Sequence, residues 1–251
     1  MSLALALLGF VLVGIALGLL GGGGSILAVP VLVNLMSIPM KSAVPMALPV
    51  VGIAAAAGAF ARWRRGELKF STVALFAVCS MGASYLAARL GVGIADRTRL
   101  FLFAGIMLVA AIAMWRRASR GAASQARAAH PWQLVVPVAL IVGTLTGILG
   151  VGGGFLIVPA LAGVLALPMA EATATSLAVI ALNAASAGAG FLSNHVAIDW
   201  RLTVFVTVAA LIGMAIGLRM APRYSSATLA RSFAVLLVLL AAFSIGKELV
   251  A

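Results

Sequence analysis

Two glycine-rich stretches decide how this chain can fold: GLLGGGGSILAVPVL at residues 18–32 and GILGVGGGFLIVPAL at residues 147–161. Four glycines within five positions disfavour a continuous helix, because glycine loses the most backbone entropy when it is ordered. Each stretch leads into an unusually short apolar segment, at 26–36 and 155–167. At about 1.5 Å per residue, such a segment crosses about half of a hydrocarbon layer that is roughly 30 Å thick. We therefore predict that each stretch breaks a helix inside a membrane.

The composition of the whole chain supports a membrane location. Of the 251 residues, 64% are hydrophobic and only 9% are charged, and the mean hydropathy is +1.23. A soluble domain has about 45–50% apolar and about 25% charged residues. This chain has too few charged residues to cover the surface of a soluble domain. The apolar runs also lack the period-two alternation of a membrane β-barrel. We predict an all-α polytopic membrane protein without a separate soluble domain.

Eight longer apolar runs are expected to form the remaining membrane helices. Their limits are 3–20, 42–61, 70–88, 100–115, 132–149, 172–191, 200–218 and 229–245. Trp63, Trp115, Trp132 and Trp200 stand at the boundaries of these runs. Indole rings prefer the depth of the lipid headgroups, so the four tryptophans are expected to form interfacial anchors.

The two halves of the sequence match each other. One constant offset in numbering pairs Gly14 with Gly143, Gly18 with Gly147, Gly21 with Gly150, Pro30 with Pro159 and Pro39 with Pro168. An offset longer by a single position pairs Arg89 with Arg219. We predict two homologous membrane repeats, residues 1–115 and 132–251, joined by a basic connector at residues 116–131. Each repeat would contain a glycine-broken hairpin or half-helix plus three transmembrane helices.

The relative orientation of the repeats follows less directly from the sequence. The favoured arrangement is inverted, because two hairpins entering from opposite membrane faces would meet at mid-membrane, as in many transporters. Parallel repeats stay open, because the basic residues divide between the two faces almost equally well in both arrangements. The connector is expected to be cytoplasmic, since it carries one of the two densest groups of arginines.

The charge and cysteine content indicate which partners and which covalent links to expect. The formal net charge is +12, but the basic residues stand in short connectors between apolar runs. They are expected to set the topology and to meet anionic lipid headgroups, so membrane lipids are expected partners and nucleic acid is not. The single cysteine, Cys79, excludes an internal disulfide. No carboxylate falls inside an apolar run, so an acidic proton relay is not expected.

The glycine breaks have a predicted chemistry. A helix that starts after a break presents unpaired N–H groups and the positive end of its dipole, and successive glycines can turn their N–H groups toward one anion. Ser25 is expected to cap the first new helix. The predicted substrate-binding backbone comprises Gly22, Gly23, Gly24, Ser25, Gly152, Gly153 and Gly154. The alternative is that these glycines serve close helix packing, which is the expected role of Gly14, Gly18, Gly143 and Gly147.

The doubled glycine motif, together with EATATSLAV at 171–179 and AGAGFLSNHVAIDWRL at 187–202, resembles the TauE/SafE family of sulfite and sulfonate exporters. The resemblance covers nearly the whole chain. It implies a multi-pass inner-membrane carrier of small sulfur-containing anions such as sulfite, sulfoacetate or related sulfonates. Thr175 and Ser176 stand where the family has a Thr-Ser pair, whereas the first half has Met46 and Ala47. The expected binding residues therefore lie mainly in the second half.

Polar side chains in the run 172–191 could complete such a site. Ser176, Asn183 and Ser186 are spaced to share one helical face, and Thr175 precedes them. Their hydroxyl and amide groups could donate to an oxyanion, or they could form hydrogen bonds between helices. Asn34 is a weaker candidate of the same kind. His195 lies in an expected connector, where a solvated loop is the simpler interpretation.

Other functions are less well supported by the residues. Ser25 and His195 could be imagined as a catalytic pair, but a third orienting group and a nucleophile motif are missing, so an enzyme is not expected. An anion channel or a structural subunit of a membrane complex remains the alternative to a carrier. No cofactor and no metal are expected, the expected partner is a small anionic substrate, and a homodimer is left open.

Overall fold

The computed structural model describes residues 3–90, 96–119, 132–149, 154–193 and 198–250. Within these ranges every regular element is a helix, which confirms the all-α polytopic prediction. The first half contains α1 (Leu3–Leu20), α2 (Ser25–Pro30), η1 (Val31–Leu35), α3 (Met40–Trp63), α4 (Phe70–Leu90) and α5 (Asp96–Ser119). The second half contains α6 (Trp132–Leu149), α7 (Gly154–Pro159), η4 (Ala160–Val164), α8 (Met169–Ser193), α9 (Trp200–Met220), η5 (Ala221–Arg223) and α10 (Ser226–Val250).

The helices of the two halves follow one another in the same order. The starts of α6, α7, η4 and α8 are displaced from those of α1, α2, η1 and α3 by the offset that pairs Gly14 with Gly143. The starts of α9 and α10 are displaced from those of α4 and α5 by the slightly longer offset that pairs Arg89 with Arg219. The two halves therefore place their helices in matching register. A common ancestry of the halves stays a prediction.

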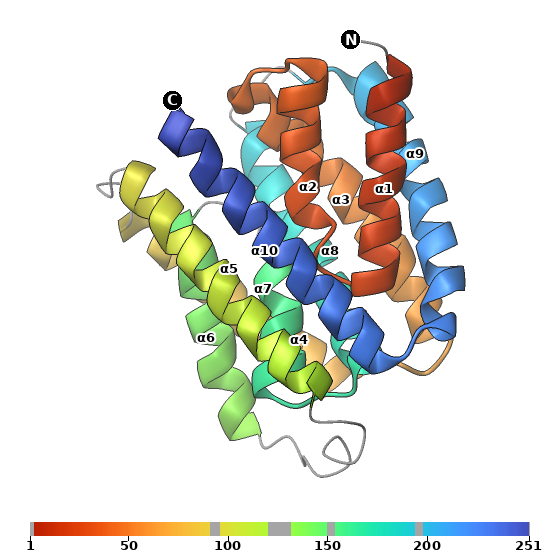
Figure 1. The fold of residues 1–251 in the computed structure, drawn as a ribbon, viewed down its shortest axis with the longest axis vertical. Coiled ribbons are helices and arrows are strands. Elements are labelled where there is room, and N and C mark those ends of the chain that lie inside the picture. Colours follow the sequence, from red (N-terminus) through yellow and green to blue (C-terminus); the bar gives the residue numbers. More distant parts are fainter. Residues whose placement is uncertain (1–2, 91–95, 120–131, 150–153, 194–197, 251) are drawn as a thin grey trace.

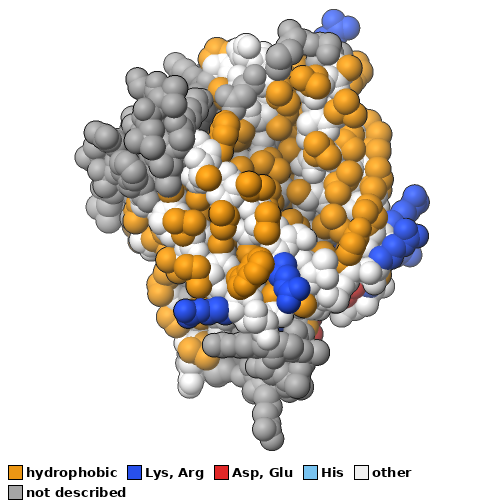
Figure 2. Space-filling view, in the orientation of Figure 1, with side chains coloured by type: hydrophobic (Ala, Val, Ile, Leu, Met, Phe, Trp, Pro, Cys, Tyr) orange, Lys and Arg blue, Asp and Glu red, His pale blue; other side chains and the backbone are white. Residues whose placement is uncertain are grey.

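Five helices are long and apolar enough to cross a membrane: Ser42–Trp63, Phe70–Ala87, Leu102–Ser119, Trp200–Arg223 and Ser226–Phe243. Shorter apolar helices occur at Ala4–Leu20, Gln133–Thr146 and Gly154–Val164. The short ones belong to the two glycine-broken segments, as the sequence predicts. On the face drawn in Figure 2, hydrophobic side chains are spread from top to bottom, which suits a chain that faces lipid.

The helix directions place the two broken segments at opposite ends of the bundle. Gly14 and Gly18 of α1 contact the backbone of Ala210 and Met214 of α9 in the same order along both helices, so α1 and α9 run parallel. Figure 1 shows α1 and α2 in the upper half of the bundle, α6 in the lower half and α7 near the middle. Corresponding helices of the two halves therefore run in opposite directions, which is the arrangement that the sequence analysis favoured.

Tight pairs of helices hold the bundle together. The helix α1 packs on α9 and α4 packs on α6, while α3 packs on α8 and α5 packs on α10. The glycines at the first two interfaces are needed there: a methyl group at Gly14 would collide with the carbonyl of Ala210, and one at Gly143 would collide with the carbonyl of Ser80. This confirms the packing role predicted for Gly14, Gly18 and Gly143. The surroundings of Gly147 lie outside the described side chains.

Each short helix after a break changes to π-helical geometry behind a proline. Pro30 ends α2 and Pro159 ends α7, and η1 and η4 are both π-helical. Proline lacks an N–H donor and its ring crowds the carbonyl four residues before it, and a wider turn relieves both problems. Each π-helix is followed by a residue in the left-handed region, Ser37 with φ 53° and Ala166 with φ 54°. Neither feature is predicted by the sequence pattern.

Candidate functional site

The first glycine break reverses the direction of the chain. Gly21 has a φ of 79°, which a residue with a side chain rarely adopts, and its N–H donates to the carbonyl of Leu17 over 2.8 Å. The helix α2 then returns along α1, so that Gly24 lies against the backbone of Val13 and Leu17. The prediction of a broken helix therefore takes the form of a hairpin in the first half.

Ser25 does not cap α2 as predicted. The helix begins at Ser25 itself, with Gly24 in the capping position and no side-chain cap. The hydroxyl of Ser25 instead donates to the carbonyl oxygen of Gly22 over 2.7 Å. The hydroxyl is oriented backward because Ser25 already has helical geometry, so its oxygen cannot reach the N–H groups of the next turn. The bond stabilises the turn of the break.

The two breaks meet inside the molecule. A side chain at Gly22 would collide with the carbonyl of Gly154, and a side chain at Gly154 would collide with the hydroxyl of Ser25. Both glycines are buried. Because Gly22 belongs to the first half and Gly154 to the second, the start of α2 and the start of α7 lie in direct backbone contact. Glycine is required at both positions for this approach.

The helix α8 covers this contact. The Cα of Thr173 lies 2.8 Å from where a Cβ of Gly21 would be, and the hydroxyl of Ser176 lies 3.1 Å from the corresponding position at Gly22. The side chain of Ser176 is fully buried, with 0% exposed, and its hydroxyl has no hydrogen-bond partner among the described residues. A buried hydroxyl without a partner costs free energy, which makes Ser176 a candidate for contact with a ligand.

The other predicted polar residues of α8 are placed differently. Thr175 is buried beside Ser176. Asn183 lies two turns, or about 10 Å, further along α8, and its buried Oδ1 also has no partner in the part of the chain that is described. The described structure thus brings Ser176 to the glycine contact, whereas Asn183 lies along the same helix and away from it. Ser186 is exposed.

The remaining predicted glycines divide into two groups. Gly23 faces α10, where a Cβ would lie 2.9 Å from the Leu236 side chain and 3.3 Å from that of Phe233. Gly24 faces α1, as described above. Packing alone accounts for glycine at these two positions. Gly152 and Gly153 lie outside the described residues, as does His195. Nothing is described of the Asn34 side chain.

Three basic residues at the end of α3 and in its connection to α4 have structural roles that the sequence pattern does not predict. Arg62 is buried, with 3% exposed; it pairs with Glu67 at 2.8 Å and donates to the carbonyl of Gly18 at 3.1 Å. Arg65 donates to the carbonyl of Leu218 over 3.4 Å, and Lys69 pairs with Glu171 over 2.8 Å. The segment 62–69 therefore binds α1, α8 and α9.

A fourth arginine supports the end of the second hairpin. Arg117 of α5 donates from Nη1 to the carbonyl of Ala162 and from Nη2 to the carbonyl of Leu167 over 2.6 Å. Both carbonyls belong to the π-helix and the turn behind Pro159, where regular helical bonding ends. From the sequence, Arg117 is expected only to help set the membrane topology. Nothing in the sequence indicates that its side chain contacts a segment 45 residues away.

The site is made of backbone and hydroxyl groups. Among the described residues, no group of three or more His, Cys, Asp and Glu side chains could hold a metal ion. The amides of Gly22 to Gly24 precede the first turn of α2, where N–H groups have no helical carbonyl partners. Such amides and a free hydroxyl are hydrogen-bond donors for an anion.

Comparisons with known proteins identify the family to which the chain belongs. Residues 5–244 match the family described as "Sulfite exporter TauE/SafE". The chain is 30% identical over 246 residues to a "Probable membrane transporter protein" of Xylella fastidiosa strain 9a5c, covering 94% of this chain and 92% of that protein. It is 25% identical over 210 residues to "Probable membrane transporter protein YdhB" of Bacillus subtilis strain 168, covering 82% and 85% of the two chains.

No solved structure matches the chain. The family match extends over both glycine breaks and all five candidate membrane spans. The relatives are named as transporters and not as enzymes. This chain is a multi-pass membrane protein that belongs to the TauE/SafE sulfite exporter family of membrane transporters.

Proposed function

We propose that this protein carries a small sulfur-containing oxyanion, such as sulfite, sulfoacetate or a related sulfonate, across the inner membrane of the cell. The anion would bind beside the contact between Gly22 and Gly154, within reach of the Ser176 hydroxyl. The observation that carries this proposal is the fully buried Ser176 hydroxyl, which has no partner among the described residues and faces the contact of the two breaks.

The chemistry of the site suits an oxyanion. Backbone N–H groups at the start of α2 and α7 would supply donors and the positive ends of two helix dipoles. In a medium of low dielectric constant these dipoles act more strongly than in water. A guanidinium or ammonium group would bind an anion more tightly, whereas dipoles and a hydroxyl leave it free to dissociate on the other side. A carrier needs that balance.

The proposed site is not symmetric. The position in α3 that corresponds to Ser176 is Ala47, which is buried and has no hydrogen-bonding side chain. One half would therefore contribute the hydroxyl and both halves would contribute backbone. This asymmetry supports the expectation that the polar contacts of the substrate come mainly from the second half.

The test is a comparison of two buried serines. Ser80 is 3% exposed and donates to the carbonyl of Ala77 over 3.2 Å, so its hydroxyl is already bonded. Purified protein should be screened for thermal stabilisation by sulfite, sulfate, thiosulfate, sulfoacetate and taurine, with cationic and neutral solutes as controls. Ser176→Ala should weaken the binding of the stabilising anion by about 10-fold or more, because hydrogen bonds to charged groups contribute about 1.5–3 kcal/mol. Ser80→Ala should bind as the wild type does.

A second readout separates binding from folding. Ser176→Ala removes a buried hydroxyl that has no partner, so the ligand-free protein should be no less stable than the wild type. Equal anion binding by Ser176→Ala and the wild type would refute the site. Counterflow of labelled anion in proteoliposomes would support a carrier over a channel, and its absence with intact anion flux would support a channel.

A further inference from the structure

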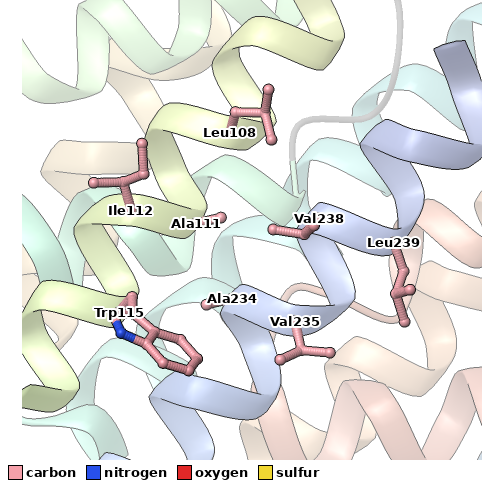
Figure 3. A pocket seen from close by; sticks show the side chains of 8 residues that line it. All are labelled: Leu108, Ala111, Ile112, Trp115, Ala234, Val235, Val238 and Leu239. Atoms are coloured by element: carbon pink, nitrogen blue, oxygen red, sulfur yellow. The ribbon is translucent and has the colours of Figure 1, made fainter.

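A groove lies between α5 and α10 on the outer surface of the bundle. It has a volume of about 290 Å³ and is lined by Leu108, Ala111, Ile112 and Trp115 of α5 and by Ala234, Val235, Val238 and Leu239 of α10. Figure 3 shows these side chains on two neighbouring helices, with Trp115 at one end and Leu108 toward the other. Each helix contributes one stripe of residues at helical spacing, so the groove runs along the helices.

The groove has an apolar floor and open walls. Ala111 and Ala234 are buried, whereas Trp115 is 52% exposed and Leu239 is 62% exposed. From Leu108 to Trp115 the groove extends over about two turns of helix, or about 10 Å. One leaflet of a bilayer has a hydrocarbon thickness of about 15 Å. The groove therefore has the length and the chemistry of a surface for most of one acyl chain.

One end of the groove is basic. Arg116 directly follows Trp115 on α5, and Arg231 lies one turn before Val235 on α10. Both arginines are exposed, and neither has an ion-pair partner among the described residues. The carboxylates of these two helices, Asp96 and Glu248, belong to their opposite ends. Figure 2 shows basic side chains among the hydrophobic ones on the lower part of the same face, and others at its right and upper edges.

Trp115 sets the depth of this end. An indole at the end of a membrane helix lies at the level of the lipid headgroups, so the neighbouring guanidinium groups lie at the level of the phosphates. A bidentate guanidinium is the side chain best suited to a phosphate. The apolar groove and the two arginines thus match the two parts of one molecule.

We propose that the α5–α10 groove binds an anionic phospholipid, with an acyl chain against Ala111 and Ala234 and its phosphate between Arg116 and Arg231. A second copy of the chain is disfavoured at this face, because a two-fold interface would bring like-charged arginines together. Since α5 and α10 also pack on each other, the bound lipid would join the ends of the two halves.

Lipid binding can be measured directly on the full chain in detergent. Phosphatidylglycerol and phosphatidylcholine are added in turn, and bound lipid is counted by native mass spectrometry. We expect one phosphatidylglycerol molecule to be retained more tightly than phosphatidylcholine. Arg116→Gln and Arg231→Gln should each weaken retention roughly fivefold, and the double variant about 25-fold, as expected for arginines near an anionic headgroup.

Two further variants test the location. Arg64→Gln removes an exposed arginine at the end of α3, away from the lining of the groove, and should retain phosphatidylglycerol as the wild type does. Val238→Phe fills the groove without a change in charge and should also weaken retention. Equal retention of both lipids, or equal losses in Arg64→Gln and Arg231→Gln, would overturn the proposal. So would disulfide-linked dimers of a Leu239→Cys variant, on a Cys79→Ala background, in native membranes.

Discussion

Arg62 donates a hydrogen bond from Nη2 to the carbonyl oxygen of Gly18 over 3.1 Å, and so joins the end of α3 to the last turn of α1. The same guanidinium pairs with Glu67. Gly18 lies three residues before Gly21, where the chain turns. The first glycine break is therefore stabilised by a buried charged side chain that binds the turn of helix before it.

Loss of Arg62 should destabilise the protein. Arg62→Gln removes two charge-assisted bonds and leaves Glu67 without its partner, so we expect a loss of about 2–3 kcal/mol in the free energy of unfolding. Denaturation in detergent, followed by circular dichroism, measures this. Arg64→Gln is the control, because Arg64 is exposed and lies two residues away. Similar losses in both variants would mean that the buried bonds contribute little.

The glycines between α1 and α9 should tolerate no side chain. Gly14→Ala would place a methyl group against the backbone of Ala210, and such overpacking costs about 1–3 kcal/mol. Gly105→Ala on α5 is the matched control, because nothing lies within 4 Å of its Cβ position. That substitution should instead raise stability by up to about 1 kcal/mol, since alanine favours helix. In thermal unfolding, the melting temperature should fall for Gly14→Ala and rise for Gly105→Ala. Changes of the same sign in both variants would contradict the packing described.

Replacing the left-handed residue behind the second π-helix by glycine should raise the stability of the protein. Ala166 has a φ of 54°, which costs a residue with a Cβ about 1–2 kcal/mol. Ala166→Gly removes that cost but adds backbone entropy, leaving a net gain of about 0.5–1 kcal/mol. Ala178→Gly, inside α8, should lose a similar amount. If Ala166→Gly and Ala178→Gly both lowered the free energy of unfolding, the turn behind η4 would not be left-handed.

Arg117 should contribute more to the stability of the protein than the neighbouring Arg116. Its bonds to the carbonyls of Ala162 and Leu167 hold the end of the second hairpin, so Arg117→Gln should lower stability by about 1.5–3 kcal/mol. Arg116→Gln, measured in lipid-free detergent, should change stability by less than about 0.5 kcal/mol, because that side chain is exposed. Equal effects would contradict a specific role of Arg117.

Opposed hairpins predict a labelling pattern. On a Cys79→Ala background, single cysteines at Arg64 and Ser225 should react from one side of the membrane, and those at Ser37 and Arg201 from the other. The reason is that α3 and α9 end at the face where the second hairpin enters, whereas η1 ends and α9 begins at the opposite face. An impermeant maleimide, applied to intact cells and to inverted vesicles, distinguishes the sides. Reaction of Arg64→Cys and Ser37→Cys from the same side would refute the topology.

Much of the fold follows from local sequence. The predicted runs 3–20 and 132–149 coincide with α1 and α6, because a long apolar run in lipid must satisfy its backbone as a helix. The glycine breaks were predicted because four glycines oppose that helix. The π-helices behind Pro30 and Pro159 were not predicted, since proline alone does not distinguish a kink from a wider turn.

The anion-binding site stays a prediction. Of the side chains proposed for it, the structure places the Ser176 hydroxyl beside Gly22 of the first break. The distinct positions of Ser176 and Asn183 could not be predicted. Their spacing shows that they lie on the same face of the helix, but it does not show which turn of that helix contacts the glycine breaks. The cap expected at Ser25 was wrong for a related reason: the helix starts one residue earlier than the cap required.

The sequence by itself determined that this chain lies in a membrane, that it is helical and where two helices break, since these depend on hydropathy and on the backbone freedom of glycine, which are local. The tertiary structure alone decided that Gly22 meets Gly154, that Arg62 reaches Gly18 and that the Ser176 hydroxyl lacks a partner among the described residues. The first two relationships join residues 44 or more positions apart, and only the packing of whole helices brings them together.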